Sequence, residues 1–285
     1  MDEVGKMKRA IISGAGGFIG TNLTKQLLAA GVEVFPTDGF ASDELPYGAD
    51  VFYHLAWKGM APAHRNDFEM QYWNIEHSLY NVRLAASLGV KKFVLPGSTF
   101  EYLHHYAPIN ELAVPSPVNA YGSTKLAVRF LCGELATQLG LGLIYTVITG
   151  VYSADRRDGN VIYYVIDELL NSRKPSLTSL EQRWDYIHIN DVCKALHLVG
   201  EKGKPGRFYS IGSGDNIPLR DYIFKIRDLI DPCLPLGIGE KPNGGKLTSS
   251  CIDLTALSED TGFVPDISFD KGIREVIEAL KREQK

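Results

Sequence analysis

The pattern of hydrophobic and polar residues in the first half of the chain predicts strands and helices in alternation. Between the predicted strands, apolar residues recur at helical spacing over Phe18–Ala30, Asp67–Leu88 and Tyr121–Leu139. Strand and helix in repetition predict an α/β fold, a doubly wound parallel sheet with helices on both faces. The short apolar runs that predict the strands are Ala10–Ile12, Val32–Phe35, Val51–Leu55, Phe93–Leu95 and Leu143–Ile148.

The pattern is less regular beyond Gly150. Short apolar runs predict strands at Tyr186–Ile189 and Phe208–Ile211. We therefore expect two regions: residues 1–150, which hold the sheet, and residues 151–285, a smaller α/β region from which some segments return to the first sheet. Helical spacing in the second region predicts helices over Val161–Leu170, Asp191–Val199, Leu219–Ile230 and Lys271–Lys281.

Composition and charge exclude several classes of protein. The chain has 285 residues, of which 45% are hydrophobic and 22% charged, as in ordinary globular domains. Its net charge of −4 provides no basic surface for nucleic acid or for a membrane, so we expect neither partner. The four cysteines lack metal-binding spacing and predict reduced thiols without a metal site. No signal sequence or membrane span is recognisable, and we expect a cytoplasmic protein.

A glycine-rich turn connects the first predicted strand to the first predicted helix. Its sequence, Ser13-Gly14-Ala15-Gly16-Gly17-Phe18-Ile19-Gly20, spaces three glycines three residues apart. Gly14 permits a tight turn, Gly17 lets a pyrophosphate approach the helix N-terminus, and Gly20 lets helix and strand pack closely. Because the motif lies between a strand and a helix, it predicts a Rossmann-type dinucleotide-binding domain in residues 1–150.

Asp38 follows the second predicted strand, where dinucleotide-binding domains carry an acidic residue. A carboxylate there accepts hydrogen bonds from the adenosine ribose hydroxyls and repels a phosphate on that ribose. No Arg or Lys lies between Phe35 and Lys58 to bind such a phosphate. The sequence therefore favours NAD over NADP.

Tyr121 and Lys125 lie four residues apart on a predicted helix and therefore share one face. A phenol with a pKa of about 10 is a poor base at neutral pH. A nearby ammonium favours the phenolate, and the same tyrosine protonates an alkoxide when a hydride reaches a ketone. In a chain with a dinucleotide-binding turn, this pair predicts an oxidoreductase.

Several motifs together resemble the extended short-chain dehydrogenase/reductase family. They are the glycine turn, His54-Leu55-Ala56, Asn74, Tyr121-x-x-x-Lys125, and later segments such as Asp185-Tyr186-Ile187-His188. Members of that family include UDP-galactose 4-epimerase, nucleotide-sugar 4,6-dehydratases and 4-keto-6-deoxysugar reductases. The resemblance covers nearly the whole chain and implies that residues 151–285 bind a nucleotide sugar.

The resemblance also implies roles for individual residues. Ser98, with Thr99 as the alternative, is the third catalytic group beside Tyr121 and Lys125, and it holds the substrate oxygen that becomes an alkoxide. The implied cofactor-binding residues are Gly14, Gly17, Phe18, Ile19, Gly20, Asp38, Leu55, Ala56, Asn74, Tyr121 and Lys125. The implied substrate-binding residues are Trp57, Ser98, Thr99, Tyr121, Asn160, Arg183, Trp184 and Lys241.

The residues after Ser98 discriminate between reactions of the family. Its 4,6-dehydratases carry Asp and Glu directly after the catalytic Thr, whereas Thr99 and Phe100 stand here, so dehydration is disfavoured. Reduction of a 4-keto-6-deoxy nucleotide sugar at carbon 4 remains, with 4-epimerisation through retained NAD as the alternative. A dinucleotide-binding sensor without catalysis is a distant third, because such relatives typically lack the Tyr–Lys pair.

Two departures from the family pattern favour the reductase. In the epimerase an arginine directly before Asp-Tyr-Ile-His holds the diphosphate, whereas Trp184 stands there and Arg183 comes one residue early. On a strand that shift sends the arginine to the opposite face, and Trp184 is either a ring-stacking or a core residue. The span from Asp38 to Asp50 is also short, so a strand and helix near the adenine are expected to be missing. The resemblance finally implies a homodimer formed through two of the long helices, Asp67–Leu88 and Tyr121–Leu139.

Overall fold

A computed structural model of the chain describes residues 6–38, 45–103, 107–155, 160–242 and 251–283. Six parallel strands form its main sheet, in the order β2-β1-β3-β4-β5-β9. The chain leaves β1 for β2 on one side and returns to β3 on the other, which confirms the expected doubly wound α/β fold of Rossmann type. The strands are β1 (Arg9–Ser13), β2 (Glu33–Thr37), β3 (Val51–His54), β4 (Lys92–Ser98), β5 (Gly142–Ile148) and β9 (Phe208–Ile211).

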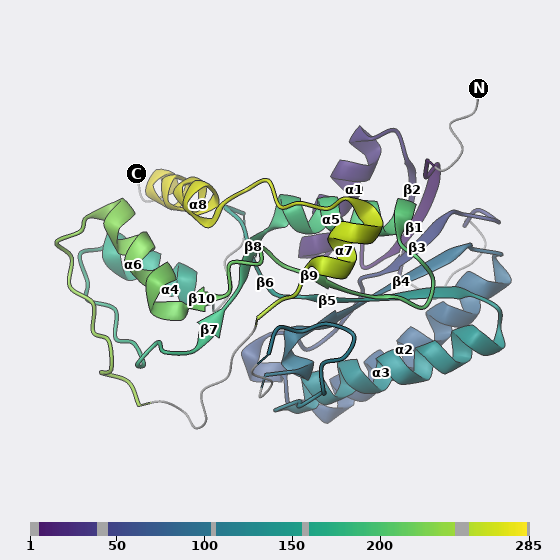
Figure 1. The fold of residues 1–285 in the computed structure, drawn as a ribbon, viewed down its shortest axis with the longest axis horizontal. Coiled ribbons are helices and arrows are strands. Elements are labelled where there is room, and N and C mark those ends of the chain that lie inside the picture. The colour runs from purple at the N-terminus through teal and green to yellow at the C-terminus, as the bar shows by residue number, and fades with distance from the viewer. Residues whose placement is uncertain (1–5, 39–44, 104–106, 156–159, 243–250, 284–285) are drawn as a thin grey trace.

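Helices cover both faces of this sheet (Figure 1). On one face lie α1 (Phe18–Ala29), α5 (Ile189–Lys202) and α7 (Thr255–Thr261); on the other lie α2 (Phe68–Ser87) and α3 (Ala120–Gln138). Side chains alternate between the faces along each strand, so Ala10 and Ile12 join the first core while Ile11 joins the second. The continuous apolar runs in the sequence reflect this burial on both sides.

A second, smaller part of the molecule lies beyond the carboxyl ends of the strands (Figure 1). Its core is rich in aromatic rings, and the rings of Tyr222 and Phe269 lie 4.6 Å apart. One of its two short two-stranded sheets also reaches the first core, through Val151 and Ile187. Its elements are α4 (Val161–Leu170), α6 (Leu219–Ile230), α8 (Phe269–Glu283), β6 (Gly150–Tyr152) with β8 (Tyr186–His188), and β7 (Arg183–Trp184) with β10 (Ile217–Pro218).

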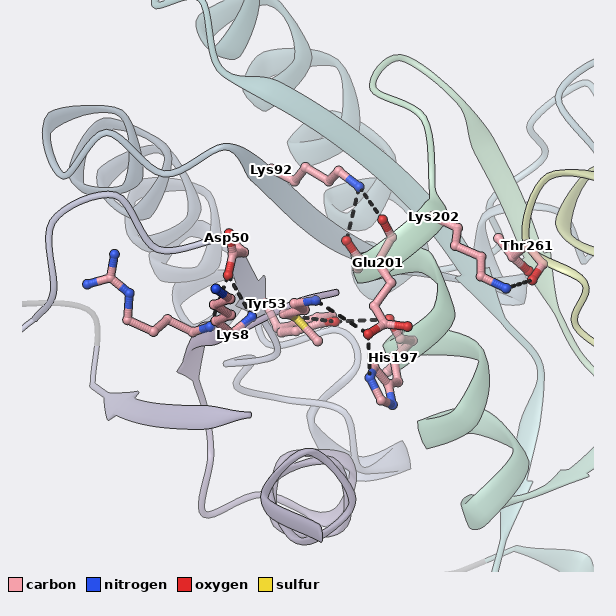
Figure 2. A network of polar contacts seen from close by, with 12 residues as sticks. Lys8, Asp50, Tyr53, Lys92, His197, Glu201, Lys202 and Thr261 are labelled. Carbon is pink, nitrogen blue, oxygen red and sulfur yellow. Dashed lines mark hydrogen bonds and ion pairs between the residues drawn. The ribbon is translucent and has the colours of Figure 1, made fainter. Parts of the chain in front are cut away.

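Polar contacts tie the end of α5 to the sheet (Figure 2). Lys92 of β4 donates to the carbonyls of Gly200 and Glu201 at 3.1 and 2.9 Å, where a helix C-terminus attracts a cation. The Tyr53 hydroxyl of β3 donates to Leu196 O at 3.1 Å. A side chain at Gly200 would meet that hydroxyl, since its Cβ would lie 1.9 Å away. Helix α5, from the second half of the sequence, therefore packs on the main sheet, on the same face as α1 and α7.

The long elements occur where the sequence predicts them, with ends that differ by a few residues. Strand β4 is longer than predicted and runs to Ser98, which places that residue at the strand end. The sequence reading missed β6, β7, β10, α7 and two short 3-10 helices, η1 (Pro62–His64) and η2 (Thr99–Glu101), because elements of two to seven residues show no readable period. No helix in the described part of the chain is both long and apolar enough to cross a bilayer.

Candidate active site

The sequence-predicted cofactor and catalytic residues gather at the carboxyl ends of the parallel strands. Strand β1 ends at Ser13, β3 at His54 and β4 at Ser98. Buried His54 links two neighbouring elements, because its Nδ1 lies 2.7 Å from Ser13 Oγ and its Nε2 lies 2.9 Å from Ser78 Oγ of α2. In open parallel sheets this edge is where ligands bind.

The glycine turn packs tightly against the segment after β3. Gly14 has a φ of +74°, and a Cβ there would lie 2.6 Å from Ala56 N. A Cβ on Gly20 would lie 2.1 Å from Gly14 O, so only glycine lets α1 approach the turn this closely. The structure thus brings Gly14, Gly20, Leu55 and Ala56 together, as the sequence reading requires.

The N-terminus of α1 is built to receive an anion. Gly17 is its N-cap, without a capping side chain, and the first turn carries no acidic residue. A Cβ on Gly16 would meet nothing within 4 Å, so the turn is open at Gly16, and Phe18 and Ile19 follow in the first turn of α1. Backbone N–H groups and the helix dipole at such an end favour a pyrophosphate. These residues therefore fit the diphosphate of a dinucleotide.

Asp38 lies directly after β2 and is exposed. Its backbone oxygen accepts a hydrogen bond from His77 Nε2 of α2 at 2.8 Å, which fixes the end of the strand. The His77 ring stacks on Trp73 at 4.4 Å, and Lys58 Nζ lies 3.6 Å from the centre of the Trp73 ring. Asp38 thus lies near a basic and aromatic cluster of Lys58, Trp73 and His77 that the sequence did not predict.

Asn74 supports the segment that follows β3. Its Oδ1 accepts from Lys58 N at 2.8 Å and its Nδ2 donates to Lys58 O at 2.9 Å. Both polar groups of the side chain are therefore engaged with the backbone, so Asn74 holds the loop that carries Leu55, Ala56 and Trp57 against the glycine turn.

Tyr121 and Lys125 lie on the buried face of the first turns of α3. Asn119 begins this helix, since its side chain accepts from Gly122 N at 2.9 Å. Each of the two side chains is 8% exposed. Lys125 Nζ donates to Pro96 O of β4 at 2.9 Å. Burial lowers the pKa of Lys125, and the nearby Glu101 carboxylate opposes that shift.

Aromatic rings surround Tyr121 on two sides. The Trp57 ring meets it edge-on at 6.0 Å and the Phe100 ring does so at 5.7 Å. Trp57 also covers Lys125, whose Nζ lies 3.6 Å from the centre of the indole ring. Trp57 Nε1 is buried without a hydrogen-bond partner among the described residues, as is uncommon for an indole. The residue that the sequence reading assigned to the substrate thus touches both catalytic candidates.

Ser98 and Thr99 occupy the junction of β4 and η2, and both are buried. Ser98 Oγ accepts from Phe100 N at 3.3 Å, and Ser98 N donates to Glu101 Oε1 at 2.7 Å. This reciprocal pair is a capping box, which fixes the backbone at the predicted catalytic serine.

The remaining substrate candidates lie in the second part of the molecule. Trp184 of β7 is half-buried and packs 6.3 Å from the ring of Tyr186, whose hydroxyl lies 3.4 Å from Asn160 Oδ1. Asn160 is the N-cap of α4. Arg183 is exposed beside Trp184, and Lys241 lies over the ring of Tyr164 at 4.7 Å. Trp184 and Asn160 thus share Tyr186 as a neighbour, and Asn160 and Lys241 share Tyr164, whose N–H donates to Asn160 O at 3.2 Å.

Two further residues, Arg65 and Glu101, contact the site without having been predicted as site residues. Arg65 lies over the Phe100 ring at 4.2 Å, and its backbone oxygen accepts from Tyr121 N at 2.9 Å. Glu101 is fully buried beside Ser98. An acid between two aromatic residues, Phe100 and Tyr102, was the available signal for Glu101. The segment Met60–Arg65 was a candidate lining of the sugar pocket in the sequence, without a separate role for Arg65. Among the described residues no cluster of His, Cys, Asp or Glu is arranged to hold a metal.

Sequence comparison identifies a matching family and related enzymes. A family model described as the NAD dependent epimerase/dehydratase family matches residues 10–212. The dTDP-glucose 4,6-dehydratase of Salmonella typhimurium is 26% identical over 178 residues, which cover 59% of this chain and 49% of that enzyme. The UDP-glucose 4-epimerase of Corynebacterium glutamicum is 25% identical over 216 residues, covering 69% and 65%. The chain thus spans between 49% and 65% of the length of these relatives.

Solved structures share the fold over nearly the whole chain. RMD from Pseudomonas aeruginosa, complexed with NADPH, superimposes with a TM-score of 0.84 at 20% identity, covering 97% of this chain and 99% of that one. UDP-glucuronic acid 4-epimerase from Bacillus cereus, bound to UDP-glucuronic acid and NAD, gives 0.83 at 19% identity, with coverages of 96% and 99%. Since the family model matches well over half of the sequence, this chain belongs to the NAD dependent epimerase/dehydratase family.

Proposed function

We propose that this protein is an NAD-dependent reductase that acts at carbon 4 of a 4-keto-6-deoxy nucleotide sugar. The proposal is supported mainly by the proximity of α3, which carries Tyr121 and Lys125, to the carboxyl end of β4, which carries Ser98. The relatives of known activity act on nucleotide sugars, which supports this substrate class.

Each of the three residues has a defined task. The Tyr121 hydroxyl donates a proton to the oxygen at carbon 4 as the ketone becomes an alcohol. Lys125 is its neighbour on α3, and the positive charge of its ammonium favours the phenolate that remains after the proton is transferred. Ser98 holds the same substrate oxygen from the end of β4. NAD in its reduced form supplies the hydride when bound, with its diphosphate at the N-terminus of α1 and its adenosine ribose at Asp38.

The residues around Tyr121 argue against dehydration. Elimination of water needs an acid and a base beside the sugar, whereas Thr99 is buried and Phe100 presents a ring to Tyr121. Glu101 is an acid, but its Oε1 accepts from Ser98 N and from the Tyr145 hydroxyl of β5, and the residue is fully buried. Its carboxylate therefore points into the protein. The chemistry available to the sugar is hydride and proton exchange at carbon 4.

The same residues also support 4-epimerisation, the second candidate. Epimerisation needs NAD that stays bound and a ketone intermediate that turns over in the site. Trp184 stands where the family's epimerase has an arginine that binds the diphosphate. The contact that would hold the nucleotide while the sugar rotates is therefore altered. This difference favours the reductase.

The test begins with the cofactor content of the purified protein. The proposal predicts little retained NAD. It also predicts steady oxidation of added NADH with 4-keto-6-deoxy sugars carried on UDP, GDP, dTDP or CDP, followed by the absorbance of the reduced nicotinamide. NADPH serves as the matched cofactor, and Tyr121→Phe as the matched enzyme.

Tightly retained NAD together with interconversion of 4-hydroxy epimers, and no consumption of NADH, would replace the reductase by the epimerase. Binding of NADH with no reaction in either assay would support the sensor. Both outcomes contradict the proposal.

We also propose that the protein is a homodimer formed through α2 and α3. The two helices pack on one another and still expose large apolar side chains: Phe68, Tyr72, Phe130 and Leu131 are 75%, 59%, 58% and 46% exposed. Exposed apolar surface of this kind favours association. Sedimentation of the wild-type protein and of the Phe130→Lys variant tests this, with the variant expected to sediment as a monomer.

A further inference from the structure

Glu101 is a fully buried acid that the proposed reaction does not use. It lies in η2, directly after β4. Its Oε1 accepts two hydrogen bonds, from Ser98 N at 2.7 Å and from the Tyr145 hydroxyl at 2.8 Å. Its Oε2 is buried and has no hydrogen-bond partner within the part of the chain that the structure describes. Burying a carboxylate with one unpaired oxygen costs free energy, which suggests that Glu101 has a role other than packing.

The carboxylate lies directly over the backbone of β4, opposite the catalytic lysine. Lys125 Nζ binds the carbonyl of Pro96, and Glu101 binds the N–H of Ser98, so the two charged groups hold the peptide groups on either side of Gly97. A Cβ on Gly97 would lie 2.5 Å from Glu101 Oε1 and 2.1 Å from the Tyr145 hydroxyl. Only glycine at this position admits the carboxylate.

The electrostatics of the two groups depend on one another. Burial lowers the pKa of Lys125, and Glu101 is the group that raises it again. Burial raises the pKa of Glu101, while the hydrogen bonds from Ser98 and Tyr145 and the charges of Lys125 and Arg129 lower it. Neither buried group retains its charge as readily without the other.

The other ionisable groups that face the pair do not replace either charge. Arg129, one turn after Lys125, donates to the Tyr102 hydroxyl at 2.6 Å, and burial raises the pKa of Tyr102 and of Tyr145, which keeps both phenols neutral. His54 of β3 faces Lys125, and burial lowers its pKa, which keeps it neutral. Among these groups Glu101 is thus the acid whose negative charge, when it is ionised, acts on the Lys125 ammonium.

We propose that Glu101 is a positioning residue of the active site: its carboxylate fixes the backbone at Ser98 and is the buried counter-charge of the Lys125 ammonium across the Gly97 backbone. The inference rests on the proposed function for its effect on turnover, because Tyr121, Lys125 and Ser98 are the groups through which Glu101 acts. Its electrostatic part concerns the protein alone and needs no sugar.

Two substitutions separate charge from shape. Glu101→Gln keeps an oxygen that accepts from Ser98 and Tyr145 but removes the charge. Glu101→Asp keeps the charge but shortens the reach to Ser98. A residue that only fills space would lower the stability of both variants without changing the titration of Lys125.

The direct measurement is the titration of Lys125 by NMR in protein with carbon-13 at the lysine ε position. The Lys125→Met variant assigns the resonance, which the Trp57 ring shifts because it lies 3.6 Å from Nζ. We expect Glu101→Gln to move the Lys125 midpoint down by about one pH unit or more, and Glu101→Asp to leave it near the wild-type value. An unchanged midpoint in a folded Glu101→Gln variant would overturn the proposal.

If Glu101→Gln does not fold, the reciprocal titration decides. Linkage requires that the loss of the Lys125 charge raises the midpoint of Glu101 as much as the loss of Glu101 lowers that of Lys125. The Glu101 carboxyl, followed in wild type and in Lys125→Met, is therefore expected to titrate at higher pH in the variant. Equal midpoints would contradict the proposal.

Turnover gives the second readout. In Glu101→Gln the alkaline limb of kcat, where Lys125 loses its proton, should move to lower pH by the same amount as the NMR midpoint, with the affinity for NADH unchanged. Glu101→Asp should lower kcat at every pH without moving the limb. If the NMR shift occurs but no sugar is reduced, the proposed function fails alone; if sugars are reduced and neither midpoint moves, this inference fails alone.

Discussion

The surroundings of Tyr121 and of Trp184 are built by different kinds of structure. Tyr121 lies on α3, a helix of 19 residues, next to a strand of seven residues in the middle of the sheet. Trp184 lies on β7, a strand of two residues that pairs only with β10 in the described part of the chain. The position of Tyr121 is fixed by packing on both sides of its helix, whereas the position of Trp184 depends on a few contacts.

Burial differs in the same sense. The catalytic candidates Tyr121, Lys125 and Ser98 are 8%, 8% and 9% exposed, whereas Arg183 is exposed and Trp184 half-buried. A buried group that makes its interaction in the transition state affects kcat, and a group that binds the substrate throughout affects KM. Under the proposed function, this difference assigns the chemistry to the residues at the carboxyl ends of the sheet strands and the choice of sugar nucleotide to the second part.

The largest effect is expected for Tyr121→Phe. Loss of the proton donor should lower kcat by about 10²- to 10⁴-fold, with the KM for the sugar and the free energy of unfolding almost unchanged. Steady-state kinetics and urea unfolding measure these quantities. Tyr47→Phe, at an exposed position before β3 and outside α2 and α3, is the matched control. Full turnover in Tyr121→Phe would show that Tyr121 is not the proton donor and would contradict the proposed contrast between the two regions.

A smaller effect is expected at Asp38, which belongs to the sheet but contacts no sugar. Asp38→Arg removes the acceptor for the ribose hydroxyls and provides a partner for a ribose phosphate. It should weaken NADH binding by at least about tenfold and strengthen NADPH binding. Titration of the bound cofactor by fluorescence, with Asp38→Asn as the control that keeps an acceptor oxygen, checks this. Equal affinities for both cofactors in wild type and variant would show that the adenosine lies elsewhere.

Trp184→Ala tests the other side of the comparison. If the indole stacks on a ring of the substrate, its loss should raise the KM for the sugar about tenfold while kcat and NADH affinity stay within the error of measurement. Trp184→Phe, which keeps an aromatic face, should recover most of the affinity. A fall in kcat with unchanged KM would instead make Trp184 part of the catalytic arrangement.

The smallest effect concerns pH and the buried His54. Burial lowers the pKa of His54 well below its usual value, so the folded protein keeps it neutral. The unfolded chain binds a proton at His54 below pH of about 6.5, so this stability is present above that pH and lost as the pH falls. His54→Asn should be less stable at neutral pH but lose about 1 kcal/mol less per pH unit on acidification.

Urea unfolding at neutral and mildly acidic pH measures the effect on His54. His77 and His188 also have lowered pKa values, caused mainly by burial, so part of the acid sensitivity remains in the variant. An equal loss of stability in wild type and variant would contradict the assignment of a neutral, structural His54 at the sheet edge.

The sequence predicts the elements of the main sheet better than those of the second part, because the former are marked by local patterns. Gly31, Gly89 and Gly140 each have positive φ just after a long helix, so helix ends there are encoded locally. The glycine turn and the Tyr121–Lys125 pair are also local patterns. The site of Glu101 is different, because it requires Gly97 on β4 and Tyr145 on β5 to be brought together by the register of two strands. No local sequence pattern predicts the register between β4 and β5.

The return of β9 to the sheet has a consequence for how the protein is made. Strand β5 is paired on one side with β4, and its other edge is closed by Phe208–Ile211, which the ribosome adds some sixty residues later. Until then the nascent chain carries an open, apolar strand edge of the kind that pairs with other chains. A cut near residue 150 would make that exposure permanent, so we expect a fragment ending there to aggregate even though it contains the glycine turn and both members of the Tyr121–Lys125 pair.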